Sequence, residues 1–285
     1  MSTIKDLLAA GPTLSVEFFP PKTDDGLAQL RRTVDDFAPL DLSYVSVTYG
    51  AGGSNRDRTR DLVVELNQDQ PYPAMAHLTC MGHTRAELDQ LLVDYDTHGV
   101  HDILALAGDP PADGSPAGGD FTYADELVSL VRSHGDGFSV GVAAHPELHP
   151  RSTDRAQDRR HLADKLGRAD FAVTQFFFDA GDYFRMVDEL AALGCTKPVV
   201  PGVMPLSNPT GVRRMSTMAG CAFPEELAAR VEGAASDEER HRIVVDAAVA
   251  LSRELLDGGV PGLHLYCLNR SPIVLDVVGQ LGLRP

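Results

Sequence analysis

The chain has 285 residues, of which 43% are hydrophobic and 23% charged, a composition typical of a globular protein with one large α/β domain or two ordinary ones. Its net charge of -16, from 25 basic and 41 acidic residues, argues against a nucleic-acid partner, which would need a basic face. The chain shows no secretory h-region and no run near the roughly 20 apolar residues of a membrane span, so we expect a cytoplasmic protein without a membrane partner.

Short apolar runs alternate along the chain with segments of helical period. A short helix is expected first, over "IKDLLAA" (4–10). Eight strand-like runs follow, each with a helix candidate after it: 14–19, 44–50, 73–80, 102–108, 138–145, 171–178, 198–205 and 262–268. No linker splits the chain in half. We therefore predict one α/β domain over residues 1–285, a (β/α)8 TIM barrel with a short extra N-terminal helix.

Several helix starts carry explicit capping signals. Thr84 with Glu87, and Ser236 with Glu239, match the capping-box pattern ahead of an apolar helical stripe. The segment "SNP" (207–209) offers an asparagine cap followed by proline at the first helical position. We expect a helix to begin at each of these three places.

Polar residues stand where the predicted strands end. Because barrel active sites are assembled at the C-terminal ends of the strands, these residues are the candidates for function. Any one of them alone could equally be a turn former or a hydrogen-bonded filler of a barrel layer. They are Glu17, Thr48, His77, Thr79, Asp109, His145, Gln175, Asn269 and Arg270.

Glu17 is the sharpest candidate, since it is a carboxylate within the apolar run "LSVEFFPP" (14–21). The period of a strand puts Ser15, Glu17 and Phe19 on one face and Val16 and Phe18 on the other, and the apolar pair suits the helix layer. Glu17 would then face the barrel mouth, where apolar surroundings favour the protonated carboxyl group near neutral pH. This pattern is typical of a general acid; a buried structural ion pair is the alternative.

No metal site is predicted. In "HPELHP" (145–150) the residues His145, Glu147 and His149 are spaced two apart, which is not a usual metal spacing, and further ligands would be needed. The four cysteines lie far apart with no CxxC pair, so neither a zinc site nor a disulfide framework is indicated.

Two loops near the strand ends suggest ligands of different kinds. The glycines of "YGAGGSNRDRT" (49–59) could cradle phosphate, but neither a dinucleotide fingerprint nor a P-loop is complete, so a flexible turn is the better interpretation. "QFFFD" (175–179) puts aromatic surface beside the amide of Gln175, which suits a flat heterocycle such as a pterin or flavin. Core packing is the competing interpretation for some of these phenylalanines.

Taken together and in order, "SVEFFPPK", "VSVTYGAGGS", "AHLTC", "GDPP", "PELHP", "TQFFFD" and "LNR" closely resemble the bacterial methylenetetrahydrofolate reductases. The resemblance spans most of the chain. It implies a (β/α)8 barrel that reduces 5,10-methylenetetrahydrofolate to 5-methyltetrahydrofolate with NADH or NADPH, typically through FAD, in the supply of methyl groups for methionine. The partners would be a folate and a nicotinamide dinucleotide; a homo-oligomer is compatible with the sequence.

The resemblance also assigns roles to single residues. Glu17 matches the general acid that protonates the folate, and Asp109 matches an aspartate near the pterin and flavin that stabilises developing positive charge. Gln175 would bind the pterin, Arg270 the glutamate tail of the folate, and Met215 takes the place of a substrate-stacking phenylalanine.

Other positions match the flavin contacts of the family. At three positions among these contacts the chain has a different residue from the family. Ala107 and Asp164 stand where arginines would contact phosphate, and His145 stands where the family has tyrosine or phenylalanine. The missing cations predict weakened FAD binding, which leaves two routes for the hydride: through FAD, or directly from the nicotinamide. The cofactor positions that the resemblance assigns are Thr48, Tyr49, Ala51, His77, Gly108, Asp109, Ala124, His149, Asp158 and Lys165, together with the departing His145.

Two other functions remain open on the residues alone. One is another pterin-binding barrel, such as a methyl transferase, which would need no hydride donor. The other is a folate-binding protein without enzymatic activity on a degenerate barrel, although retention of Glu17, Asp109 and Gln175 argues against it.

Overall fold

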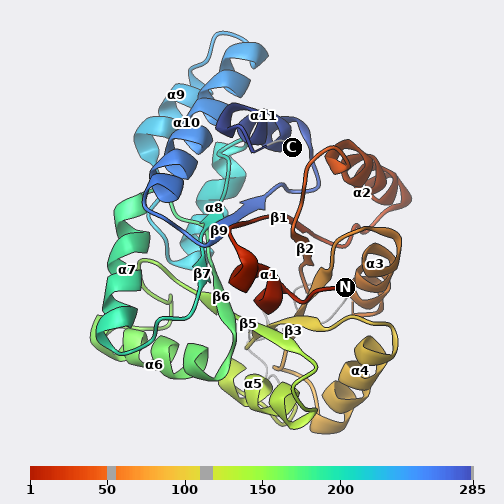
Figure 1. Ribbon diagram of the computed structural model, residues 1–285. Coiled ribbons are helices and arrows are strands. Elements are labelled where there is room, and N and C mark those ends of the chain that lie inside the picture. Colours follow the sequence, from red (N-terminus) through yellow and green to blue (C-terminus); the bar gives the residue numbers. More distant parts are fainter. Residues whose placement is uncertain (50–55, 110–117, 284–285) are drawn as a thin grey trace.

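The computed structural model describes residues 1–49, 56–109 and 118–283 and shows parallel strands that alternate with helices around a barrel (Figure 1). The strands are β1 (Thr13–Phe18), β2 (Tyr44–Val47), β3 (Ala74–Thr79), β4 (Asp102–Leu106), β5 (Ser139–Ala144), β6 (Phe171–Thr174), β7 (Val199–Val200), β8 (Gly202–Val203) and β9 (Gly262–Tyr266). All pairs of neighbouring strands are parallel, in the order β7-β6-β5-β4-β3-β2-β1-β9-β8.

The ring closes through a strand that is split in two. The predicted run 198–205 forms β7, which pairs with β6, and β8, which pairs with β9. Pro201 lies between them and has no N–H for a sheet hydrogen bond, while its carbonyl still accepts the His264 N–H at 3.0 Å. The barrel prediction is therefore confirmed, with its seventh strand divided at the proline.

Helices cover the outside of the barrel, as its apolar outward-facing strand residues require. Phe18 of β1, for example, is fully buried and lies 6.2 Å from the Phe37 ring of the following helix, measured between ring centroids. The outer helices are α2 (Asp24–Phe37), α3 (Arg56–Asp69), α4 (Arg85–Thr97), α5 (Ala124–Ser133), α6 (Arg155–Arg168), α7 (Ala180–Ala192), α8 (Pro209–Ala219), α9 (Glu225–Glu232), α10 (Asp237–Asp257) and α11 (Pro272–Leu281). No described helix is both long and apolar enough to cross a bilayer.

The predicted helix starts are confirmed at their caps. The Thr84 hydroxyl accepts the Glu87 N–H at 3.3 Å and the Glu87 carboxylate accepts the Thr84 N–H at 2.7 Å, a complete capping box for α4. Asn208 caps α8 ahead of a proline. Ser236 caps α10, but the Glu239 carboxylate reaches back one residue further than a capping box predicts, to the Ala235 N–H.

The helix α1 (Ile4–Ala10) closes the N-terminal end of the barrel, and Figure 1 shows it within the ring of strands. Its first N–H groups are satisfied by strand residues: the Ile4 N–H donates to the Asp102 carboxylate at 2.7 Å, and the Lys5 N–H donates to the Ser139 hydroxyl at 3.1 Å. Apolar barrel-interior residues pack with Ile4 and Leu8 of α1. This end of the barrel is therefore a packed floor.

Small residues make room for the large rings of the interior. A Cβ on Gly141 would lie 2.7 Å from the Phe171 ring, and a Cβ on Gly202 would lie 2.6 Å from the Tyr266 ring. The interior changes character along the axis, from the apolar floor to a layer with Ser15, Ser46 and His264, which leaves the polar chemistry at the mouth.

Candidate active site

Glu17 lies near the C-terminal end of β1 with its side chain 17% exposed. Its Oε2 atom is 3.5 Å from Nε2 of His77, on β3, and 3.6 Å from Nε2 of His264, on β9. These separations exceed a normal N–H···O hydrogen bond of about 2.9 Å. The predicted orientation of Glu17 into the barrel is confirmed, and the carboxyl group stands between two imidazoles.

His77 is buried, and the environment keeps its ring neutral. Burial lowers the pKa of His77 to about 4, against the opposing effect of the nearby Glu17 charge. The sequence analysis named His77 as a strand-end candidate and as a cofactor contact, and the fold places it beside Glu17.

His264 was not identified from the sequence, although the strand period contains the signal. In the pairing of β1 with β9, Ser15 lies opposite His264 and Glu17 lies opposite Tyr266, so all four side chains follow the same alternation. His264 is fully buried, with Nδ1 2.8 Å from the Ser15 hydroxyl and Nε2 3.4 Å from the Ser46 hydroxyl. Knowing the neighbour of the first strand would have been enough to find it.

Tyr266 and Cys267 complete the surroundings of Glu17. The Tyr266 hydroxyl donates to the Thr174 carbonyl at 2.8 Å, and burial, together with the Glu17 charge, raises its pKa well above the usual value. The Cys267 thiol donates to the Glu17 backbone carbonyl at 3.0 Å, and burial raises its pKa to about 12. Both groups therefore stay uncharged next to the carboxyl group.

Asp109 lies exposed at the rim of the barrel mouth. It directly follows Gly108, whose backbone conformation favours glycine. Gly108 has a φ of 92°, and a Cβ there would lie 3.1 Å from Cβ of Thr79. The Arg151 guanidinium donates to the Gly108 carbonyl at 3.4 Å. Gly108 thus positions Asp109 at the end of β4, where its charge also acts on His149.

His145 and His149 lie together at the end of β5, with ring centroids 4.7 Å apart in an edge-on arrangement. Burial lowers the pKa of His145 to about 3 and also lowers that of His149, helped by neighbouring cations. Glu147, between them in sequence, points elsewhere: its carboxylate accepts the Ala222 N–H at 2.9 Å. The three residues therefore do not converge on one point.

A buried arginine holds this loop in place. Arg159 donates to the carbonyls of His145, Pro146 and Glu147, and its guanidinium pairs with Asp158 at 2.7 Å and Glu189 at 2.8 Å. Its side chain is 3% exposed. A fully paired and hydrogen-bonded guanidinium is the form in which a buried charge is tolerated, so Arg159 builds the loop.

Lys165 is a second buried cation on α6. Its Nζ donates to the Ala143 carbonyl at 2.9 Å, and burial lowers its pKa to about 8, against the charges of Asp158 and Asp125. Lys165, Asp158 and His149, three of the matched cofactor positions, interact electrostatically and so lie in one neighbourhood.

The opposite side of the mouth is aromatic and apolar. The Gln175 side-chain oxygen accepts the Phe176 N–H at 3.0 Å, and the Phe176 ring meets the Tyr266 ring edge-on at 6.0 Å. Met215 of α8 packs against the same cluster, as do Phe178 and Leu268. Phe177 instead stacks on Tyr183 in the outer core, which confirms the core-packing interpretation for that ring.

The segment after β9 contains two predicted site residues, Asn269 and Arg270, with different surroundings. The Asn269 side chain accepts the Phe19 N–H at 3.0 Å and donates to the Phe19 carbonyl at 2.8 Å, which fixes the chain beyond β1. Arg270 is exposed at the rim. Asn269, which the sequence analysis named as a candidate at the mouth, therefore has a structural role: its side chain binds the backbone of Phe19.

The remaining predicted contacts lie around the ends of β2 and β4. The Thr48 N–H donates to the Phe18 carbonyl at 2.9 Å, the Tyr49 hydroxyl is 3.1 Å from Nε2 of His83, and Ala124 begins α5. Ala51 and the glycines of its loop lie outside the described residues.

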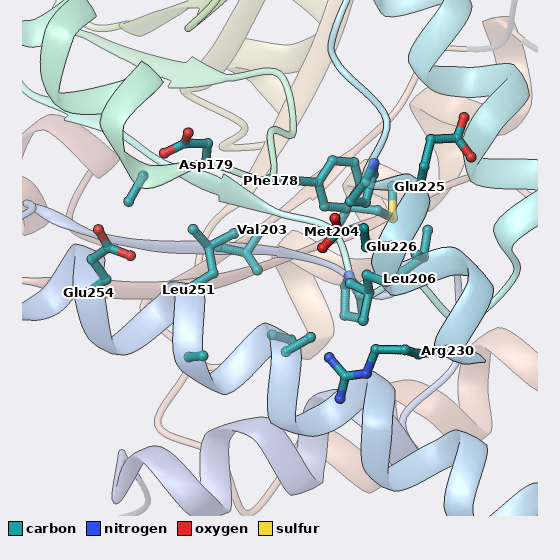
Figure 2. Close-up of a pocket in the computed structure, with 17 residues that line it drawn as sticks. Phe178, Asp179, Val203, Met204, Leu206, Glu225, Glu226, Arg230, Leu251 and Glu254 are labelled. Atoms are coloured by element: carbon teal, nitrogen blue, oxygen red, sulfur yellow. The ribbon is translucent and has the colours of Figure 1, made fainter. Parts of the chain in front are cut away.

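A cavity of about 630 Å³ lies outside the mouth, bounded by the end of β8, the start of α7, α9 and α10 (Figure 2). Val203, Met204 and Leu251 form apolar parts of its lining, and the carboxylates that line it include Glu226 and Glu254. Met204 also belongs to the apolar cluster beside Tyr266, so the cavity backs onto the aromatic side of the mouth.

Comparison with known sequences identifies one family. The family described as methylenetetrahydrofolate reductase matches residues 3–282. The chain is 36% identical over 278 residues to the 5,10-methylenetetrahydrofolate reductase of Pectobacterium carotovorum, covering 95% of this chain and 91% of that relative. It is 32% identical over 296 residues to "Methylenetetrahydrofolate reductase (NADH) 1" of Arabidopsis thaliana, covering 98% of this chain and 50% of that relative.

Comparison with solved structures supports the fold. An uncharacterised protein from Clostridium thermocellum, described as binding two copies of 5-methyl-5,6,7,8-tetrahydrofolic acid, superimposes with a TM-score of 0.65 at 13% identity, covering 98% of this chain and 96% of that chain. At this identity the likeness concerns the arrangement of strands and helices.

Proposed function

The chain belongs to the methylenetetrahydrofolate reductase family and reduces 5,10-methylenetetrahydrofolate; on that premise we propose that Glu17 supplies the proton and a reduced nicotinamide the hydride. The observation that carries the proposal is the Glu17 carboxyl group inside the barrel mouth, between the imidazoles of His77 and His264. A carboxyl group in such a protected position can deliver a proton to a nitrogen of a bound substrate.

The chemistry requires one proton and one hydride. Glu17 donates its proton to N10 of the folate as the bond between N10 and the one-carbon unit breaks, which leaves an iminium ion at N5. The hydride then adds to the iminium carbon and gives the 5-methyl product, and the Glu17 carboxylate regains a proton from solvent. Asp109, exposed at the rim, would stabilise the positive charge of the iminium ion electrostatically.

The folate would lie against the aromatic side of the mouth. Phe176 and Met215 belong to one apolar cluster that a pterin ring could contact, with the amide of Gln175 at its edge. The exposed guanidinium of Arg270 suits the carboxylates of a glutamate tail. Both kinds of contact would orient the substrate with N10 toward Glu17.

The described residues fit a tightly held FAD poorly. A resident flavin needs charge-assisted bonds to its pyrophosphate, yet Ala107 carries no charge and Asp164 is an exposed carboxylate. Two cations of α6 are engaged elsewhere: Lys165 with the Ala143 carbonyl and Arg168 with Asp125 at 3.1 Å. Each lost charge-assisted bond costs roughly 1.5 to 3 kcal/mol, about ten- to a hundredfold in affinity.

A nicotinamide substrate tolerates this loss better than a resident cofactor does. It binds and leaves in every turnover, so a modest affinity suffices. We therefore favour NADH, or NADPH, as the direct hydride donor, in the place where other members of the family hold a flavin.

The test combines a spectrum with an assay on the purified, undialysed protein. We expect no stoichiometric flavin absorption, and we expect oxidation of NADH that depends on methylenetetrahydrofolate without added FAD. A repeat with NADPH measures the preference between the two donors.

Two results would contradict the proposal. A stoichiometric yellow chromophore, or activity that appears only after FAD is added, would restore the flavin route. Folate binding without any oxidation of either nicotinamide would contradict the hydride transfer itself, and isothermal titration with the folate supplies that control.

A further inference from the structure

We propose that the Phe19 ring is the contact surface for the p-aminobenzoyl ring of the folate, and that the buried Asn269 side chain is a positioning residue that holds Phe19 for this contact. The inference rests on the proposed function, because it takes the place of the folate from the proposed roles of Glu17 and Arg270. It adds a site for the part of the substrate that joins N10 to the glutamate tail.

Phe19 presents an aromatic side chain at the barrel mouth. It lies directly after β1 and is 42% exposed, whereas Phe18 before it is fully buried against the outer helices. Alternation along an extended chain therefore gives Phe19 the same face as Glu17, two residues earlier. Its apolar surface is available to a ligand that lies in the mouth.

The backbone of Phe19 is held on both of its polar groups. The Asn269 side chain accepts the Phe19 N–H at 3.0 Å and donates to the Phe19 carbonyl at 2.8 Å. The next residue is Pro20, whose ring disfavours a helical backbone at Phe19. A single exposed apolar side chain needs no explanation by itself. Here, however, the two hydrogen bonds fix the direction in which the side chain leaves the backbone.

Asn269 is itself held in a costly conformation. Its φ is 56° and that of Leu268 is 50°, both in the left-handed region that residues other than glycine adopt infrequently. The Asn269 carbonyl accepts the hydroxyl of Thr33, a buried residue of α2, at 2.9 Å. Strained backbone persists only where the surrounding contacts determine it, and it is concentrated at functional sites. The support for Phe19 is therefore built from both α2 and the segment after β9.

The chemistry of the folate identifies the ring that belongs at Phe19. In the proposed complex N10 lies at Glu17, and the glutamate carboxylates lie at Arg270. The p-aminobenzoyl group is bonded to N10 at one end and to the glutamate at the other, so it spans the space between these two residues. Phe19 lies about 7 Å of extended chain beyond Glu17, and it is hydrogen-bonded to the residue before Arg270. A flat ring in this space meets Phe19 in offset or edge-on contact.

The other flat rings of the reaction are assigned to different parts of the mouth. The pterin is assigned to the apolar cluster that contains Phe176 and Met215, after β6 and β8. The nicotinamide is assigned to the cofactor positions that follow β2 to β5. In the strand order, the neighbours β1 and β9 lie between β2 and β8 (Figure 1). Phe19 therefore stands between the two assigned regions, where the middle of the folate passes.

The first experiment measures the affinity of Phe19→Ala for 5-methyltetrahydrofolate by isothermal titration. Loss of the aromatic contact should weaken binding by about tenfold. KM for methylenetetrahydrofolate should rise by a similar factor, while kcat and KM for NADH change less than about threefold, because the contact holds substrate and transition state alike. Phe19→Tyr keeps the ring and should bind the folate within about threefold of the unchanged protein.

Leu193→Ala is the matched control for the loss of an exposed apolar side chain. Leu193 is 46% exposed, but it follows α7 at the floor end of the barrel. Its substitution should leave the affinity for the folate unchanged.

Asn269→Gly tests the positioning role. Glycine adopts a φ of 56° without strain, so this variant removes both hydrogen bonds to Phe19 and still permits the native backbone. Folate binding should weaken by about three- to tenfold, and the double variant with Phe19→Ala should bind little more weakly than Phe19→Ala alone, because both changes remove one contact. Additive losses of affinity would contradict the positioning role, since a merely structural Asn269 would act independently of the ring.

Nuclear Overhauser spectra of protein labelled in its phenylalanine rings locate the contact without turnover. In the complex with 5-methyltetrahydrofolate, Phe19 signals are assigned by their loss in Phe19→Ala. Cross-peaks from Phe19 to the aminobenzoyl protons support the inference. Cross-peaks only to the pterin or its methyl group, no cross-peak at all, or a folate affinity of Phe19→Ala equal to that of Leu193→Ala overturns it.

These measurements separate the inference from the function on which it rests. Binding and the spectrum do not depend on proton transfer, so a failure of Glu17 as the acid leaves both results intact. Absence of folate binding by the unchanged protein would instead contradict the proposed function, and the site at Phe19 with it.

Discussion

Each end of the barrel holds a carboxyl group inside the protein, and the two carboxyl groups differ in their hydrogen bonding. Asp102 at the floor accepts the Ile4 N–H at 2.7 Å and a hydrogen bond from Ser139, so its oxygens are occupied by the chain itself. Glu17 at the mouth stands 3.5 and 3.6 Å from two imidazole nitrogens, beyond normal hydrogen-bond length.

This difference separates residues that build the fold from residues available for chemistry. The floor carboxyl fixes a helix to the strands, and its pKa is about 7 because burial raises it. The mouth carboxyl lies farther than a normal hydrogen bond from both imidazoles and is available to a bound substrate. Matched substitutions at the two ends should therefore affect different measurements, and the same isosteric change serves at both.

The largest effect is expected for Glu17→Gln, which keeps the shape of the side chain and removes the acid. We expect kcat to fall by about 10² to 10⁴, the usual contribution of a general acid, with little change in the unfolding midpoint. Steady-state oxidation of NADH and urea denaturation measure the two quantities on the same preparation.

The matched control is Asp102→Asn at the floor, which should retain most of the activity. If Glu17→Gln keeps full activity, the acid assignment fails. If both variants lose activity equally, the distinction between a structural carboxyl at the floor and a catalytic carboxyl at the mouth is contradicted.

Asp102→Asn should instead change how stability depends on pH. The folded pKa of about 7 lies above the unfolded value of about 3.9, so the stabilising contribution of the protonated carboxyl is complete below about pH 4 and is lost as the pH rises through about 7. Between pH 4.5 and 7.5 the free energy of unfolding should therefore move in favour of the asparagine variant by about 2 to 4 kcal/mol. Urea melts of both proteins at the two pH values check this, and a constant difference would contradict it.

A smaller effect is expected at Gly108, which positions Asp109. Gly108→Ala places a Cβ 3.1 Å from Thr79 at a φ of 92°, and should cost about 1 to 2 kcal/mol of stability with a further loss of activity. Gly135→Ala is the matched control, because its φ is 99° but a Cβ there meets no atom within 4 Å. Denaturation midpoints and NADH oxidation for the pair separate backbone strain from displacement of the mouth.

Chain order and period were enough to predict most of the barrel. The predicted runs 102–108 and 171–178 contain β4 and β6 and extend past their C-terminal ends, where residues leave the ladder to form the mouth. The run 14–19 overlaps β1, which begins one residue earlier, at Thr13. The helix α9 was not predicted, because no cap signal marks it and its N-cap residue, Pro224, makes no side-chain cap bond.

The sequence by itself determined the alternation of strands and helices, the inward face of Glu17 and the membership in a reductase family. Only the tertiary structure decided which side chains surround that acid. The neighbours of Glu17 come from β3 and β9, 60 and 247 residues away, and the pairing of β1 with the last strand is a long-range contact that no local period encodes. His264 could therefore be identified only from the closed barrel, in which the pairing of β1 with β9 places its ring near the Glu17 carboxyl group.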